Sequence, residues 1–515
     1  MVFVMVLPSC TKDFEEINTN PNDVPVAMPQ QLLAPALVDV LRPNMLRNRN
    51  FNNELMQVTV NITDADAAVF RYEFRNTFSD YLWNSWFIQL TNFKDIYKLA
   101  SQEDENFNTS YQGISLICQA WVYSLLTDTY GDIPYTESNM AKEGIVEPVF
   151  DRQRDIYLDI FDKLEQANEL LKTNQTIVST SDPVFNGNIS RWRKFGNSLY
   201  LRLLMRVSGK QEVASDVIAK IKSIVDEEAS NYPKMTSNDD SAILRWVGSG
   251  PYISPYMTNV RAQDFRDPAI GSFFIDHLRD WADPRLDIST YGTNGVNRWG
   301  ITQGPNGFSG VPSGYVPGTG IAKNSDFYSY DERAESLQSD QLTGMIMNYA
   351  ELQFILAEAA AKGWIAGSAE THYYTGVLNS ITLWLPKWPN PTATTTVTTP
   401  ARITDPEFIN YIATAELQWN ESLPLDASEG DSKMEKIHLQ KYYAMFLADL
   451  QQWFEYRRTG HPILPKGPGL RNNGVMPARM VYPVYVQSAN PTNYKLAVQA
   501  QGPDQISTEV WWQKP

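Results

Sequence analysis

Apolar residues recur at helical spacing along most of the chain. The clearest stripe lies in residues 151–171, where apolar side chains recur every three to four positions and so share one helix face. Its members are Ile156, Ile160, Leu164, Ala167 and Leu171. A second stripe, in residues 435–458, precedes Arg457, Arg458, Gly460 and Pro462, a typical helix stop. Both segments are therefore predicted to be long helices.

Similar but weaker patterns predict a mainly α fold. Helical patterns begin near Gln30, and eight further ranges are expected to be helical. They are residues 53–62, 81–100, 107–129, 191–208, 212–228, 345–362, 370–385 and 406–421. Paired antiparallel helices of this size suggest a repeat-like scaffold, although no fixed 34-residue signature recurs.

One long segment, residues 230–341, shows no helical period and is expected to be loop-rich. Within it, residues 292–320 hold nine of the chain's 28 glycines. The same segment is rich in aromatic residues, which disordered segments usually lack, so an ordered and functional loop is expected. Residues 11–28 are polar and indicate an extended tether, whereas residues 461–515 indicate irregular coil with a short strand.

The charge and motif content exclude several classes of function. The net charge of −16 makes nucleic acid an unfavourable partner. We find no zinc motif, P-loop, dinucleotide fingerprint or Gly-x-Ser-x-Gly elbow, so no catalytic residue, metal or cofactor is predicted. A catalytic carboxylate pair stays possible among 59 acidic residues. Calcium binding at Asp64 and Asp66 is a weaker alternative.

The N-terminal residues resemble the end of a bacterial lipoprotein signal. Residues 1–9 are apolar and then small, and Cys10 follows. The apolar run is short and no basic residue precedes it, so the printed start is expected to lie inside a longer signal. We expect Cys10 to carry lipid and to be the only attachment to the membrane.

Several segments, in order along almost the whole chain, together resemble the SusD/RagB family. The most typical are residues 126–135 (Leu-Thr-Asp-Thr-Tyr-Gly-Asp-Ile-Pro-Tyr) and residues 348–359 (Asn-Tyr-Ala-Glu-Leu-Gln-Phe-Ile-Leu-Ala-Glu-Ala). The others are residues 10–22, 157–171, 195–206, 283–286, 453–462 and 479–483. In residues 10–22, Lys12 and Asp13 resemble the signal that sends such lipoproteins to the cell surface.

The resemblance implies a single SusD-like domain over residues 29–515 with TPR-like helical hairpins. Its helical scaffold would comprise residues 29–229 and 342–460, with residues 230–341 as a loop-rich insertion. The family's role implies a non-enzymatic, surface-exposed outer-membrane lipoprotein. Such a protein binds oligosaccharide or peptide and works with a SusC-like TonB-dependent transporter. A helical-barrel glycoside hydrolase and a TPR-type protein-interaction module are the alternatives.

Aromatic rings of the glycine-rich segment are the predicted ligand contacts. An exposed indole offers the largest apolar face to a sugar ring, so Trp299 is the first choice. Its neighbours Asn297 and Arg298 could bond hydroxyl or carbonyl groups, and Phe308 and Tyr315 are second choices. Phe70 and Tyr72 are added because the family's ligand face is often built partly from that early region. Alternatively, these rings pin the long loop to the scaffold. Glu351 and Glu358 are expected to bond within the scaffold.

Overall fold

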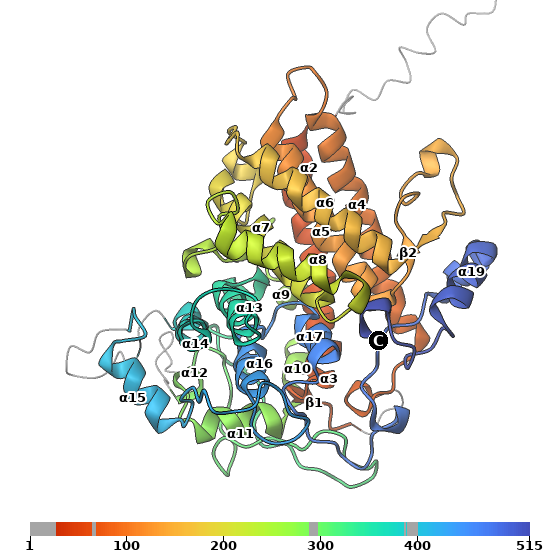
Figure 1. The fold of residues 1–515 in the computed structure, drawn as a ribbon. Helices are drawn as coiled ribbons and strands as arrows, with labels where there is room; N and C mark the ends of the chain where they lie inside the picture. The colour runs from red at the N-terminus through yellow and green to blue at the C-terminus, as the bar shows by residue number, and fades with distance from the viewer. Residues whose placement is uncertain (1–26, 64–67, 288–296, 386–387, 389–399, 515) are drawn as a thin grey trace, which may run out of the picture.

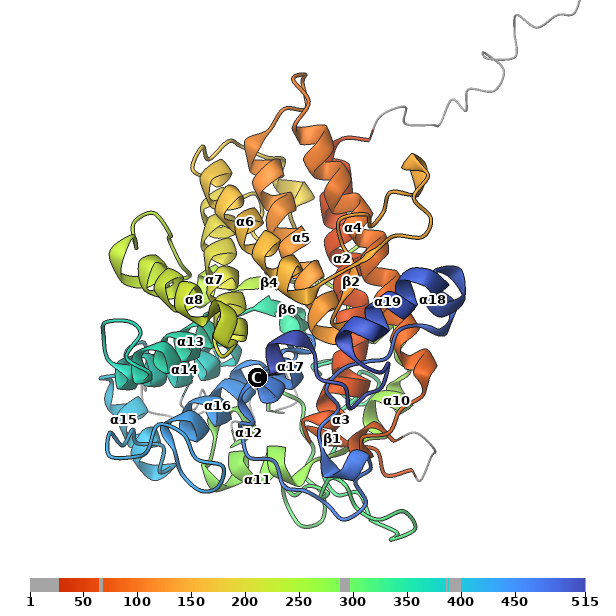
Figure 2. The same cartoon turned by 45° about the vertical axis from the view of Figure 1, so that its right-hand side comes forward.

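The computed structural model describes residues 27–63, 68–287, 297–385, 388 and 400–514. Its N-terminal half is a row of helices that pack on one another in chain order (Figures 1 and 2). They are α2 (Pro29–Arg47), α4 (Asp80–Ala100), α5 (Thr109–Tyr130), α6 (Gln153–Leu171), α7 (Ile189–Val207) and α8 (Gln211–Lys222). The mainly helical fold class is thereby confirmed.

Helix α5 lies at the centre of this row and is buried on nearly every side. Asn108 caps its first turn by accepting hydrogen bonds from the backbone N–H groups of Ser110 and Tyr111. Gly131 ends it at φ +85°, a backbone conformation that side chains with a Cβ rarely adopt. The helix therefore ends in a turn at Gly131.

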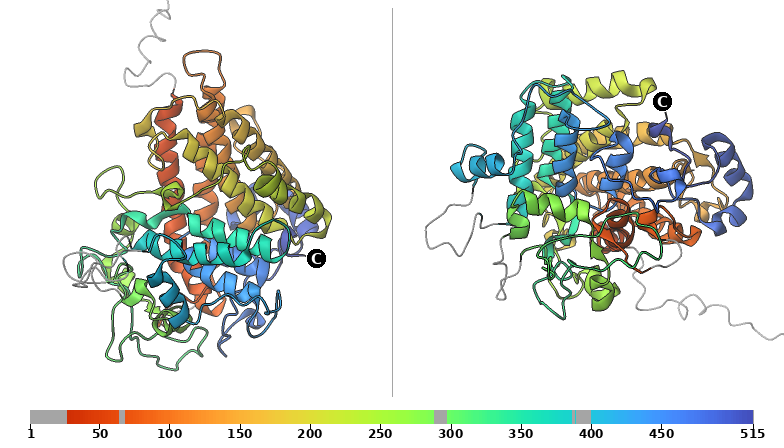
Figure 3. Two further views of the ribbon diagram at one scale, coloured as in Figure 1. Left: turned by 60° about the vertical axis from the view of Figure 1, so that its left-hand side comes forward. Right: turned by 90° about the horizontal axis from the view of Figure 1, so that it is seen from below.

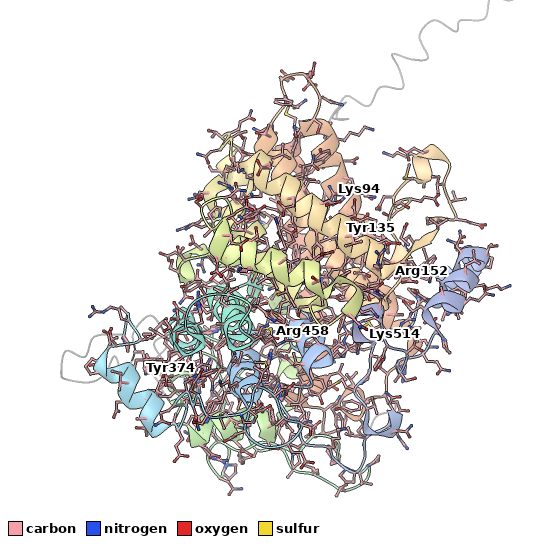
Figure 4. All side chains as sticks on the ribbon, in the orientation of Figure 1. Lys94, Tyr135, Arg152, Tyr374, Arg458 and Lys514 are labelled. Atoms are coloured by element: carbon pink, nitrogen blue, oxygen red, sulfur yellow. The ribbon has the colours of Figure 1, made fainter. Side chains whose placement is uncertain are left out.

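A second helical group lies beneath the first (Figure 3). It consists of α13 (Tyr349–Ala361), α14 (Ala369–Trp384), α15 (Pro406–Thr414), α16 (Lys433–Ala444) and α17 (Gln451–Thr459). One buried ion pair joins the two groups, and another lies within the second group. Arg202 on α7 donates to both carboxylate oxygens of Glu351 on α13, each at 2.7 Å. Glu358 pairs with Arg458, which Figure 4 labels near the centre of the molecule. Both glutamates therefore bond within the scaffold, as predicted.

The long segment between the two groups starts and ends in one strand pair. Strand β4 (Ala242–Leu244) pairs with β6 (Gly344–Met347), which fixes the ends of the intervening chain side by side. That chain holds the short helices α9 (Pro255–Asn259), α10 (Ala262–Arg266), α11 (Ser272–Asp280) and α12 (Pro284–Asp287). The segment is loop-rich but is more helical than expected.

Three other predicted elements are wrong in detail. The helix over 435–458 is two helices, because the backbone turns at Leu447 (φ +71°) and Asp449 (φ +33°). The Asp449 side chain accepts hydrogen bonds from Leu450 N and Gln451 Nε2, which favours the break. Residues 53–62 form only the short α3 (Asn53–Leu55), before strand β1 (Thr59–Val60). Residues 344–347 form β6 rather than the start of a helix.

The C-terminal part contains two helices where irregular coil was expected. They are α18 (Val484–Ala489) and α19 (Pro491–Gln501). Only Val486 is buried in α18, and only Ala497 and Gln501 are buried in α19. Because so few side chains face the core, the sequence shows no apolar stripe there.

Candidate ligand-binding cleft

Two short strands set the frame of a surface cleft of about 470 Å³. Strand β1 pairs antiparallel with β5 (Ala269–Ile270), so the residues after β1 lie beside the residues before β5. Side chains from both segments, and from the turns around α3, form the walls. The lining residues are Arg49, Asn50, Glu54, Asn61, Thr63, Ala68, Val69, Arg75, Phe78, Asp264, Asp267 and Pro268.

The inner wall carries a buried carboxyl group and an arginine. Glu54 is 7% exposed, and burial raises its pKa to about 7, against a hydrogen bond from Phe70 N and the charge of Arg49. Arg49 donates to the backbone oxygen of Asp264 at 3.0 Å, whereas its Nε has no partner among the described residues. Two bonds from Arg261 hold the pKa of Asp264 below its usual value. The cleft thus presents both donors and acceptors.

The outer wall offers two charged groups that have no partner within the described part of the chain. Among the described residues, neither the guanidinium of Arg75 nor the carboxylate of Asp267 forms an ion pair or hydrogen bond, and both residues are exposed. Beside them lies the ring of Phe78, with the Arg47 guanidinium 3.9 Å from its centroid. Free charged groups beside an aromatic ring suit a ligand rich in hydroxyl groups.

The glycine-rich segment supports this cleft from behind. Tyr315 stacks on Phe70 with ring centroids 5.1 Å apart, and its hydroxyl donates to the backbone oxygen of Asn61 at 3.1 Å. Gly310 lets the same segment lie against the start of α11, because a Cβ at Gly310 would lie only 2.5 Å from Ser272 N. Two regions predicted to form the ligand face are therefore in contact. Phe70 (0% exposed) and Tyr315 (7%) are nevertheless largely buried in that contact.

The predicted exposure of Trp299 is wrong. Its side chain is 0% exposed and packs against Phe446, with ring centroids 4.9 Å apart, and against Phe274 and Trp384. The surrounding aromatic residues come from α11, α14 and the turn after α16, which the sequence alone could not place around it. The indole therefore has no open face for a sugar ring in this structure.

The neighbours of Trp299 are also bonded within the fold. The Arg298 guanidinium donates to the Asp340 carboxylate at 2.6 and 3.1 Å. The Asn297 side chain exchanges two hydrogen bonds with the backbone of Ile301. Both residues are at most 6% exposed, so the pinning alternative describes these three positions best.

The two remaining candidates lie at different depths. Tyr72 is 3% exposed and takes the left-handed conformation that ends a turn after Phe70. Phe308 is half-buried against the core, and its backbone oxygen accepts a hydrogen bond from Arg279. Neither lines the cleft. Asp64 and Asp66, like Cys10, lie outside the described residues.

Tyr330 was not among the predicted contacts although its ring is 47% exposed. The next residue, Asp331, pairs at 3.3 Å with Arg266 at the end of α10, the helix that carries Asp264. Tyr330 therefore lies near α10, although it is not among the residues that line the cleft. Its position in the aromatic-rich segment made it a possible contact in the sequence. Only the exposed fractions of the two side chains, 47% for Tyr330 and 0% for Trp299, favour it over Trp299.

One buried group of three side chains could in principle hold a metal ion. Among the described residues, Glu358, His438 and Glu455 place their ligand atoms within 4.8 Å of one another. Arg458 already bonds to both carboxylates, and Lys441 lies 3.2 Å from Glu455. These cations neutralise the acidic pair, so the group is a structural ion network.

No described helix is long and apolar enough to cross a membrane.

Comparison with known protein families matches most of the chain. The family model described as "Starch-binding associating with outer membrane" matches residues 21–483. No curated protein matches the sequence.

Solved structures share the fold along their whole length. A chitin-binding SusD homologue from Flavobacterium johnsoniae is 20% identical with a TM-score of 0.72, covering 94% of this chain and 98% of that one. A SusD homologue from Bacteroides fragilis is 23% identical with a TM-score of 0.70, covering 95% and 99%. A further chitin-binding protein is 24% identical with a TM-score of 0.71, covering 94% and 99%. At these identities the likeness establishes the fold.

Proposed function

The chain belongs to the SusD-like family, and on that basis we propose that it captures oligosaccharides at the cell surface and delivers them to a SusC-like TonB-dependent transporter. The family is one of outer-membrane-associated, starch-binding proteins. The observation that carries the proposal is the cleft beside β1 and β5. Its free arginine and carboxylate stand next to an aromatic ring, on a frame fixed by strand pairing.

The lining of the cleft favours a glycan over a peptide. A hydroxyl group both donates and accepts hydrogen bonds, so neighbouring sugar hydroxyls can use Arg75 and Asp267 together. We propose that Phe78 and Tyr330 supply apolar faces for the sugar rings. One common way to bind a peptide is to add it as a strand to a free sheet edge. Strands β1 and β5 have only two residues each and offer little such edge.

The test is calorimetric titration of the soluble protein with panels of oligosaccharides and peptides. We expect at least one oligosaccharide to bind, and Arg75→Ala and Asp267→Asn each to weaken binding about tenfold or more. Because neither side chain has a partner among the described residues, both variants should keep the wild-type melting temperature. Lys142→Ala and Glu143→Gln change exposed residues outside the cleft and serve as matched controls. Binding by peptides alone would contradict the glycan proposal.

A glycoside hydrolase is the second candidate, because the cleft pairs carboxyl groups with opposite pKa shifts. The pKa of Glu54 is raised and that of Asp264 is lowered, a pattern that acid and base residues of glycosidases share. Against it, one Glu54 oxygen accepts a hydrogen bond from Phe70 N, and Arg261 engages both oxygens of Asp264. We propose that the protein binds glycan without cleaving it. New reducing ends, released by wild type but not by Glu54→Gln, would establish the hydrolase instead.

The membrane anchor and the transporter are further parts of the proposal. A protein tethered outside the membrane cannot move its ligand inward alone, so a barrel partner is needed. Crosslinking in intact cells followed by pull-down should recover a TonB-dependent transporter. Labelled palmitate should enter the wild-type precursor but not Cys10→Ala, since several acyl chains anchor a protein stably. Equal labelling of both proteins would refute the anchor at Cys10.

A further inference from the structure

A second cleft, of about 430 Å³, lies among elements that contribute nothing to the first. Helix α11 and the residue after it form one side of this cleft, and α16 forms the other. Helix α14 contributes to the inner end, and the residues after α15 contribute to the rim. The side chains that matter most are Trp281, Tyr373, Glu416, Asp431, Lys436 and Gln440.

The inner end of this second cleft holds two buried polar groups without partners. Tyr373 is 0% exposed and Gln440 is 2% exposed. Neither Tyr373 Oη nor Gln440 Nε2 has a hydrogen-bond partner within the described chain. A buried donor without an acceptor costs stability, so native proteins keep few of them, and those few need an explanation.

Three neighbouring tyrosines, by contrast, have hydrogen-bonded hydroxyl groups. The Tyr374 hydroxyl, on the next residue of α14 and labelled in Figure 4, accepts a hydrogen bond from Trp419 N at 2.9 Å. Tyr411 Oη donates to Asp283 at 2.8 Å, and Tyr443 Oη donates to the Phe274 backbone oxygen at 2.8 Å. The region thus satisfies these three hydroxyls and leaves that of Tyr373, which belongs to the lining of the cleft, without a partner among the described residues.

The rim of the second cleft supplies the complementary groups. Glu416, Asp431 and Lys436 form no ion pair or side-chain hydrogen bond with any described residue, and each lines the cleft. Trp281 lies between His277 and Tyr443, with its ring largely covered but still 9% exposed. A ligand here would meet donors at the inner end, carboxylates at the rim and an indole edge beside them.

These groups point to one class of ligand. A metal ion is disfavoured, because the only described group of three closely spaced metal-ligating side chains lies elsewhere, at Glu358, His438 and Glu455. An anion would meet the Glu416 and Asp431 carboxylates on entry. Neutral hydroxyl groups match both ends, because their oxygens accept from Tyr373 and Gln440 while their protons bond carboxylates.

We propose that this second cleft binds a single sugar residue or the end of a short oligosaccharide. The Tyr373 hydroxyl and the Gln440 amide would donate to its ring hydroxyls. This site is separate from the cleft beside β1 and β5, and each can fail without the other.

The experiment follows methyl resonances of the full soluble protein during titration with maltotriose and with N,N′-diacetylchitobiose. Leu439 reports on the second cleft and Val69 on the first, because each lines only its own. We expect one of the two sugars to shift Leu439 in the wild type. Tyr373→Phe and Gln440→Leu should each weaken that binding about fivefold or more and leave the Val69 response unchanged.

Stability gives the second readout and distinguishes a ligand site from a buried water site. If Tyr373 has no partner, Tyr373→Phe should keep or raise the melting temperature of the ligand-free protein. Tyr374→Phe is the matched control and should lower it, because it removes the bond to Trp419. The proposal is overturned if neither sugar shifts Leu439, or if Tyr373→Phe is as destabilising as Tyr374→Phe.

Discussion

Glu54 provides a prediction whose magnitude follows directly from its burial. Its pKa rises from 4.5 in the unfolded chain to about 7 in the folded protein. Below pH 4.5 the carboxyl group is protonated in both states and costs nothing. Between pH 4.5 and about 7 the unfolded chain is ionised while the folded protein keeps its proton, so stability falls as the pH rises and levels off above 7. Two and a half pKa units correspond to about 3 kcal/mol.

The perturbation is Glu54→Gln, which removes the ionisation while the amide oxygen can still accept from Phe70 N. We expect the variant to gain stability relative to wild type as the pH rises from about 4 to 8. The gain should approach about 3 kcal/mol. Denaturant unfolding of both proteins at several pH values measures the difference.

Glu358→Gln is the matched control with the opposite sign. Burial acts to raise the pKa of Glu358, but Arg458 and Lys362 hold it well below its usual range. The same substitution there should destabilise the protein at neutral pH, and the loss should shrink in acid. If the wild-type and Glu54→Gln stabilities stay parallel from pH 4 to 8, Glu54 is not a buried carboxyl group and the description of the inner wall is incorrect.

Three further substitutions test the packing that holds the cleft. Trp299→Ala should lower the free energy of unfolding by about 3–5 kcal/mol in denaturant and leave the ligand affinity of the folded protein unchanged. Lost affinity at wild-type stability would show instead that Trp299 contacts the ligand. Gly131→Ala should lower the melting temperature more than Gly144→Ala. Both have positive φ, but only at Gly131 would a Cβ meet another side chain, 1.8 Å from Gln501 Oε1; equal shifts would contradict this contact. Glu351→Ala should lower the free energy of unfolding by about 3–5 kcal/mol, because it leaves Arg202 buried and unpaired. The double variant Glu351→Leu/Arg202→Met should recover much of that loss in the same assay, and no recovery would refute the role of the unpaired charge.

The scaffold could be predicted from the sequence because its helices bury regular stripes. Residues 151–171 illustrate this, since Ile156, Ile160 and Leu164 all lie in the core. Helices α18 and α19 bury almost nothing, and therefore no stripe revealed them. The break near Asp449 depends on local side-chain bonds, which a periodic pattern does not contain.

The candidate site was harder to predict, because exposure is a property of the whole fold. Trp299 and Tyr330 belong to the same aromatic-rich segment, yet Trp299 is enclosed by α11, α14 and the turn after α16, whereas Tyr330 is exposed. The contact between Phe70 and Tyr315 joins residues more than 200 positions apart. Resemblance indicated both regions, but only the fold shows that these rings support the cleft from behind.

The most direct test of the central claim is calorimetric titration of wild type, Arg75→Ala and Asp267→Asn with the oligosaccharide panel. The account predicts that wild type binds an oligosaccharide without cleaving it, and that both variants bind it about tenfold more weakly at an unchanged melting temperature. Equal affinity of all three proteins for that sugar would contradict the assignment of the cleft as the glycan-binding site.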